Sequence, residues 1–159
     1  MENIVHCMEV VKQKIEEENP KSFKAFLKII NHRWETNLVK DLHRTAYYLY
    51  PDLHYTNNLR FKKDLIESLK DVINKLAPNI DLAKDAVEEV KYFQEATCGF
   101  VDHLAIRARG TQCPADWWLN YGWSAPNLRP IVMKILSCTT SSSGCERNWS
   151  TFGLIHTKP

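Results

Sequence analysis

The side chains that could do chemistry lie mostly in the last third of the sequence, around the run Ser143-Gly144-Cys145-Glu146-Arg147. Ser143 and Glu146 are three positions apart, which is the spacing of a capping box, so Glu146 can satisfy backbone donors at the start of a final helix. Cys145 would lie in the first turn of that helix, where a thiol pKa can be lowered. The sequence places no histidine beside this thiol, so it does not support nucleophilic catalysis.

The spacing of cysteine and histidine does not indicate a metal centre. Cys98 and His103 are five positions apart, and Cys138 and Cys145 are seven apart. Neither pair has the two-plus-two arrangement of a structural zinc site. We therefore predict no metal site and no cofactor. An odd number of cysteines, five, without tight spacing predicts reduced thiols in an intracellular protein.

Large aromatic and apolar side chains near the C-terminus are the better functional candidates. The set consists of Trp117, Trp118, Tyr121, Leu128, Ile131, Ile135, Leu136, Trp149 and Phe152. These side chains carry more apolar surface than three short helices can bury among themselves. Two interpretations stay open. Either the set packs on the N-terminal helices as core, or part of it forms an interface with another chain, where tryptophan and tyrosine are frequent anchors.

The elements that must position these residues are helices, because helical periodicity dominates and strand-type alternation never runs for more than a few residues. We expect six helices before the tryptophan pair: one ending near Asn19-Pro20, then Phe23–Trp34, about Leu38–Leu49, Phe61–Leu76, Leu82–Phe93 and Val101–Arg109. Ser22 can cap the second of these helices, and Pro51 should stop the third. Gly99 should be the C-terminal stop of the fifth. Pro114 fits the first turn of a helix that carries the tryptophan pair, and Asn127 can cap the next helix. The fold class predicted is all-α.

Composition is that of an ordinary globular protein, with 44% apolar and 25% charged residues in a chain of 159. This length suits one domain or part of one. The net charge of +2 is too balanced for charge alone to indicate nucleic-acid binding. No apolar run approaches the length of a membrane span, and the N-terminus lacks a signal pattern, so we predict no membrane partner.

The order of residues from Pro114 to Lys158 resembles the C-terminal dimerisation region of the hAT-type transposases, the plant-like branch in particular. The shared pattern comprises Pro114, Trp117-Trp118, Tyr121-Gly122, Pro126, Leu128, the apolar positions Ile131, Ile135 and Leu136, a Ser-rich turn, Glu146-Arg147-Asn148-Trp149-Ser150 and Ile155-His156-Thr157-Lys158. A softer likeness over Leu42–Pro51, followed by His54-Tyr55, matches the segment that precedes this region in the same proteins.

The resemblance implies a protein dimerisation module that forms a homodimer, or a heterodimer with a hAT-like protein, in the nucleus. It divides the chain into a helical body over residues 1–110, the end of an insertion region, and a dimerisation region over residues 113–159. The chain would then be a fragment of a split RNase H-like domain. Arg147, His156 and Lys158 could line a phosphate-contacting edge that meets DNA in the full-length context, although scattered surface charge is the alternative.

Transposases of this superfamily hold paired magnesium ions with two aspartates and one glutamate, and the resemblance places Glu146 at the position of that glutamate. The paired ions stabilise the attacking and leaving oxygens of a phosphoryl transfer. One carboxylate cannot hold two magnesium ions, so we expect no enzyme activity from this chain alone. Two alternatives are that it supplies one part of a magnesium-dependent active site completed by another chain, or that it is an inert remnant.

Overall fold

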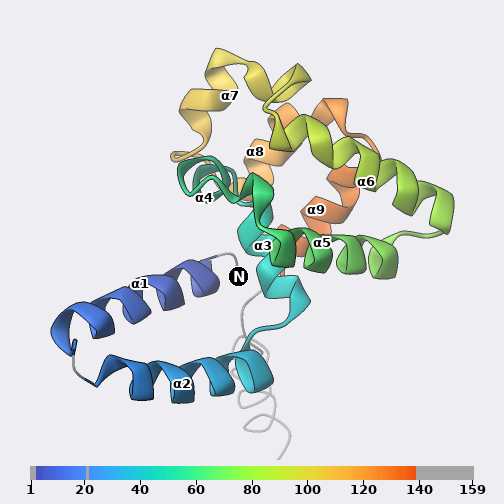
Figure 1. Cartoon of the computed structure of the whole chain (residues 1–159). Helices are drawn as coiled ribbons and strands as arrows, with labels where there is room; N and C mark the ends of the chain where they lie inside the picture. Colours follow the sequence, from blue (N-terminus) through green and yellow to red (C-terminus); the bar gives the residue numbers. More distant parts are fainter. Residues whose placement is uncertain (1–2, 21, 139–159) are drawn as a thin grey trace, which may run out of the picture.

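The structure, a computed structural model, describes residues 3–20 and 22–138 (Figure 1). Its elements are α1 (Asn3–Glu18), α2 (Phe23–Arg33), the π-helical turn η1 (Trp34–Leu38), α3 (Asp41–Leu49), α4 (Pro51–Thr56), the 3-10 turn η2 (Leu59–Phe61), α5 (Lys63–Leu76), α6 (Ile80–Gln94), the 3-10 turn η3 (Cys98–Val101), α7 (His103–Ala108), α8 (Pro114–Tyr121), the 3-10 turn η4 (Gly122–Ser124) and α9 (Leu128–Leu136). All of these elements are helical, so the all-α prediction is confirmed for the described residues.

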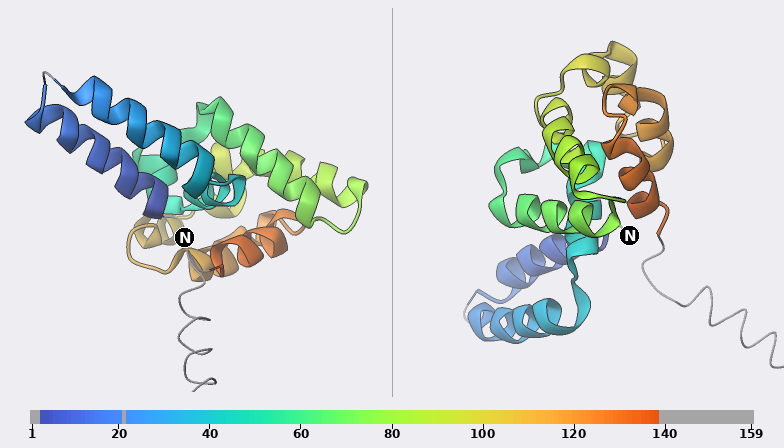
Figure 2. Two further views of the ribbon diagram at one scale, coloured as in Figure 1. Left: turned by 90° about the horizontal axis from the view of Figure 1, so that it is seen from below. Right: turned by 90° about the vertical axis from the view of Figure 1, so that its right-hand side faces the viewer.

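Helix α3 is the centre around which the other helices pack. It contacts α1, α4, α5 and α9, and the residues of its second half, Thr45–Leu49, are all buried. Figure 1 shows α5, α6, α8 and α9 grouped on one side of α3, while α1 and α2 form a hairpin that extends to the other side. Figure 2 shows the same separation from two further directions. The core therefore lies between α3 and the helices that follow it.

The α1–α2 hairpin is less well buried than its sequence pattern predicts. Helix α2 begins after Ser22 as expected, but the Ser22 side chain makes no capping hydrogen bond, and α2 contains no buried residue. Phe26, which belongs to the apolar stripe of this helix, is exposed, and so is Ile29. The reason is that α2 packs mainly on α1 and η1.

Helix α3 begins later than predicted and ends where predicted. The turn η1 occupies Trp34–Leu38, and Val39 then adopts an extended conformation, so the regular helix starts at Asp41. At the other end, Pro51 cannot donate a hydrogen bond to the preceding turn, and α3 stops at Leu49. The same proline occupies the first turn of α4, where a missing N–H has no cost.

The prediction that Gly99 stops the fifth helix is wrong. Helix α6 ends at Gln94, and Ala96 adopts the left-handed conformation with φ 50°. The Thr97 amide donates to the Tyr92 carbonyl (2.9 Å) and the Ala96 amide donates to the Phe93 carbonyl (3.2 Å), which is the Schellman pattern. Gly99 is needed for a different reason. A Cβ atom there would lie 2.5 Å from the Tyr121 carbonyl oxygen.

We predict that Ala96→Gly raises the free energy of unfolding by about 1 kcal/mol, because glycine adopts the left-handed conformation without the clash that a Cβ atom causes. Urea denaturation measures the change. Ala25, which is exposed in the first turn of α2, provides the control. Ala25→Gly should lower the free energy of unfolding by about 1 kcal/mol. A loss of stability for Ala96→Gly as well would contradict the assignment of this helix end.

Candidate protein interaction site

The tryptophan pair of α8 is fully buried and hydrogen bonded to two other helices. Pro114 occupies the first turn of α8, as predicted, and the helix directs both indoles inward. The indole Nε1 of Trp117 donates to the carbonyl oxygen of Ala105 in α7 at 2.8 Å, and that of Trp118 donates to the carbonyl oxygen of Leu49 at 2.9 Å. Both polar atoms are therefore satisfied inside the core, and α8 is connected to α7 and to the end of α3.

Aromatic rings from α6 and η3 complete this part of the core. The Phe100 ring stacks on Trp117, with ring centres 5.6 Å apart and planes 16° apart. Phe93 lies against Trp118 with ring centres 4.8 Å apart. Contacts of this kind add to the stabilisation that comes from apolar burial alone. The result is a tightly packed aromatic core beneath α8, η3 and η4.

A buried glutamate, Glu89 of α6, caps the start of α9. Its carboxylate accepts hydrogen bonds from the Asn127 amide (2.9 Å), the Leu128 amide (2.8 Å) and the Asn127 side-chain Nδ2 (2.8 Å). Asn127 occupies the predicted capping position, but its own side chain does not cap the helix. A negative charge is also favourable at the positive end of the helix dipole. Glu89 thus takes the role that we predicted for Asn127.

Sequence reasoning missed Glu89, although a signal was present. Glu89 shares the spacing of Ala86 and Phe93, which are both buried, so it lies on the inward face of α6. A charged residue on such a face must find a partner, because an unpaired buried charge is costly. The sequence alone could have predicted that the Glu89 carboxylate is hydrogen bonded, but it could not have identified the backbone amides of α9 as its partners.

We predict that Glu89→Ala lowers the free energy of unfolding by about 3 kcal/mol, because two backbone amides lose a charged acceptor. Glu89→Gln retains one oxygen acceptor and should lose about half as much. The control is Glu88→Ala, since Glu88 is exposed and pairs with the exposed Lys84 at 3.7 Å. Glu88→Ala should change the free energy of unfolding by about 0.5 kcal/mol or less. Equal losses for the two alanine variants in urea denaturation would refute the capping role.

His54 is buried within a cage of aromatic rings in the same core. Its ring centre lies 4.7 Å from that of Tyr48, 5.0 Å from that of Tyr55 and 4.4 Å from that of Phe93. Because a carbonyl can only accept, Nδ1 carries the proton that it donates to the Tyr48 carbonyl oxygen at 2.9 Å. Burial lowers the pKa of His54 to about 4, although the bond to Tyr48 opposes this change. His54 is therefore neutral at pH 7.

We predict that the free energy of unfolding falls by roughly 3 kcal/mol through His54 between pH 6.5 and pH 4. In this range the unfolded histidine binds a proton that the folded one excludes, so lower pH favours unfolding, and below pH 4 the effect levels off. His54→Phe should remove this contribution, whereas His103→Gln, at an exposed position, should retain it. Urea denaturation across this range compares the slopes. Equal slopes for wild type and His54→Phe would contradict the prediction.

Five members of the predicted interface set are buried by the chain itself: Trp117, Trp118, Leu128, Ile131 and Ile135. Tyr121 and Leu136 are half-buried against the same core. For these five residues the structure corresponds to the intramolecular interpretation, because α9 packs on α3 and α6, and α8 packs on α9 and α7. Direct contact of this set with a second chain stays a prediction. Trp149, Phe152, Glu146, Arg147, His156 and Lys158 lie outside the described residues.

Three other apolar side chains of the same region are exposed, which sequence reasoning missed. Trp123 is 64% exposed, Leu104 is 68% exposed and Val101 is 58% exposed. We call these three residues the Trp123 patch. They come from η4, α7 and η3, and η3 contacts both of the other elements. The sequence pattern did not separate Trp123 from the buried tryptophans, since only the turn at Gly122 directs its side chain outward.

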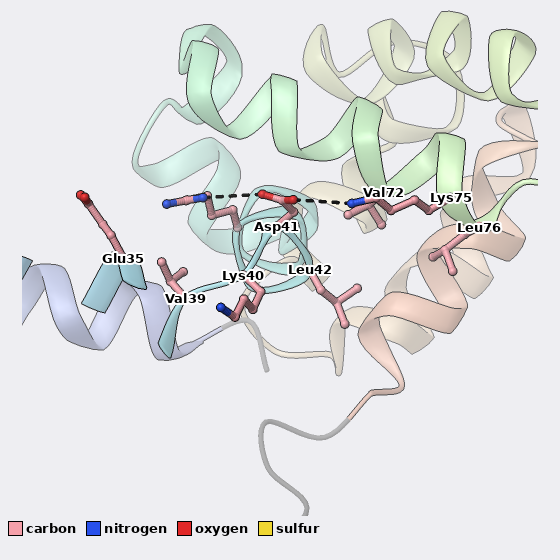
Figure 3. Close-up of a pocket in the computed structure, with 9 residues that line it drawn as sticks. Glu35, Val39, Lys40, Asp41, Leu42, Val72, Lys75 and Leu76 are labelled. Atoms are coloured by element: carbon pink, nitrogen blue, oxygen red, sulfur yellow. Dashed lines mark ion pairs between the residues drawn. The ribbon is translucent and has the colours of Figure 1, made fainter. Parts of the chain in front are cut away.

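An open hollow of about 520 Å³ lies between η1, α3 and α5 (Figure 3). Val39, Leu42, Val72 and Leu76 line its apolar part. Asp41 pairs there with Arg44 at 3.6 Å and with Lys75 at 3.8 Å. Asp41 is therefore paired with two cations, and Glu35 also lines the hollow. Among the described residues, no group of three histidine, cysteine, aspartate or glutamate side chains could hold a metal ion.

Within the described part of the chain, no helix has both the length and the apolar character that a membrane span requires.

Comparison with known proteins gives one family match and no similar individual protein. Neither the curated proteins nor the solved structures contain a significant match. The family model of the hAT family C-terminal dimerisation region matches residues 90–158, from the end of α6 through η3, α7, α8, η4 and α9. The predicted resemblance to the hAT C-terminal dimerisation region is thus confirmed over residues 90–158.

Proposed function

We propose that this chain is a protein dimerisation module derived from a hAT-like DNA transposase, and that it forms a homodimer or pairs with a hAT-like protein. The observation that carries the proposal is the match of residues 90–158 to a dimerisation region. The elements in this segment are held firmly by the rest of the chain. Trp118 bonds to α3, and Glu89 fixes the start of α9.

The physical basis of the proposal is the contrast between a rigid interior and an apolar exterior. Interfaces that bind well place their anchors on pre-organised elements, since ordering a flexible segment on binding costs free energy. Helix α8 cannot move without breaking the bonds of both buried indoles. Surface side chains on η3, α7 and η4 are therefore presented by a pre-organised platform, which favours association with another protein.

We also propose that the chain does not transfer DNA strands by itself. Glu146 is a single carboxylate at the position that the resemblance assigns to a metal ligand, and paired magnesium ions require several. On this proposal the chain is one fragment of an RNase H-like transposase domain of the plant-like branch, acts in the nucleus and contacts DNA only in the full-length context. Magnesium-dependent cleavage of DNA by the isolated chain would contradict it.

The dimerisation proposal predicts a mass in solution of twice the 18.5 kDa of the single chain. Sedimentation equilibrium from low to high micromolar concentration measures this mass and the dissociation constant. A second experiment mixes the chain with the corresponding region of a hAT transposase and looks for a heterodimer. If only single chains are present in both experiments at every concentration, the proposed function is wrong.

A further inference from the structure

We propose that the Trp123 patch is the centre of the dimer interface and that its partner is the same patch on a second copy of the chain. This inference rests on the proposed function and says where on the surface the dimer contact lies. It departs from the sequence-based expectation, which placed Trp117 and Trp118 at the interface. The two buried indoles support the surface from below, and the exposed indole of Trp123 makes the contact.

The patch is built on turns that the aromatic core holds in place. Gly99 lies directly under the Trp123 indole, and a Cβ atom at Gly99 would come within 2.8 Å of the indole Nε1. Phe100, the next residue of η3, is fully buried and stacks on Trp117. The outward position of Trp123 is thus set by close packing of η3 against η4 and not by a flexible loop.

The size of the patch fits a dimer contact. Three large side chains that are 58–68% exposed present apolar surface on the order of 400 Å², which is the size of the largest apolar patch on a typical monomeric protein, a patch that often serves a function. A standard interface buries about 800 Å² per partner, and a little more than half of that area is apolar. The Trp123 patch therefore supplies nearly all the apolar surface of one standard interface.

The charges beside the patch are compatible with self-association. Asp102 and Arg107 are both exposed and flank Leu104 along the chain. Asp102 also caps α7 by accepting from the Leu104 amide at 2.9 Å, which holds its carboxylate in place. In a two-fold contact, a residue i of one copy meets a residue j of the other, and j meets i. A surface with one acid and one base can therefore pair opposite charges at both ends of the contact.

Other exposed apolar side chains provide the matched comparison. Phe61 is 78% exposed and Ile80 is 71% exposed, but both lie outside residues 90–158. The exposed Phe26 and Ile29 of α2 form the main rival surface. Helix α2 contains no buried residue, so it is a less rigid platform than η3, α7 and η4.

The test measures the dimer dissociation constant by sedimentation equilibrium for the double variant Leu104→Ala/Trp123→Ala. We expect the dissociation constant to rise by about 30-fold or more, which is the effect of removing one interface hot spot. The control is Phe61→Ala/Ile80→Ala, which removes equally exposed apolar groups and should change the constant by less than about threefold. Circular dichroism and thermal melting first establish that each variant is folded.

Two further variants distinguish an interface role from a structural one. Leu104→Arg places a charge in the patch at a position that is largely open to solvent, so it should weaken the dimer and leave the melting temperature nearly unchanged. Trp118→Phe removes the bond to Leu49 and should lower the melting temperature, while the folded protein still dimerises.

The failures of the two proposals are distinguishable. A wild-type chain that stays single at every concentration overturns the proposed function. A wild-type dimer that is unchanged by Leu104→Ala/Trp123→Ala overturns the location alone. A dimer weakened instead by Phe26→Ala/Ile29→Ala would assign the interface to α2.

Discussion

The structure depends most on the contact between α8 and the C-terminal end of α3, where the indole of Trp118 donates to the Leu49 carbonyl across 69 positions of sequence. Pro51 ends α3 here, and the last carbonyls of a helix have no partner within it. The bond satisfies one such carbonyl and at the same time buries the largest side chain type of the protein. Because the partners are so far apart in sequence, this contact joins the early and late parts of the chain into one core.

Helix α6 connects this core to α9. Phe93 packs on Trp118 near the end of α6, and Glu89, one turn earlier, accepts three hydrogen bonds from the start of α9. The family match begins at residue 90, between these two side chains. The described part of the matched segment is therefore not a separate folding unit, because α9 packs on α3 and its start is capped by Glu89, in the part of α6 that precedes the match.

This arrangement separates two roles for the three described tryptophans of the matched segment. Trp117 and Trp118 stabilise the interior, and Trp123 remains on the surface of the same platform. A buried indole needs a partner for its N–H group, and both buried indoles have one. An exposed indole can bond to water or to another protein. The same residue type thus serves the fold at two positions and is available for binding at a third.

The sequence by itself determined the helical class, the helix ends at Leu49 and Leu76 and the start of α8 at Pro114, since periodicity and proline act over a few residues. It also determined the resemblance over the last third of the chain. It did not predict the helix end at Ala96, because alanine does not indicate a left-handed conformation. Only the tertiary structure decided which tryptophan is buried, which acid caps α9 and which apolar residues face solvent, because these outcomes depend on contacts between residues that are far apart in sequence.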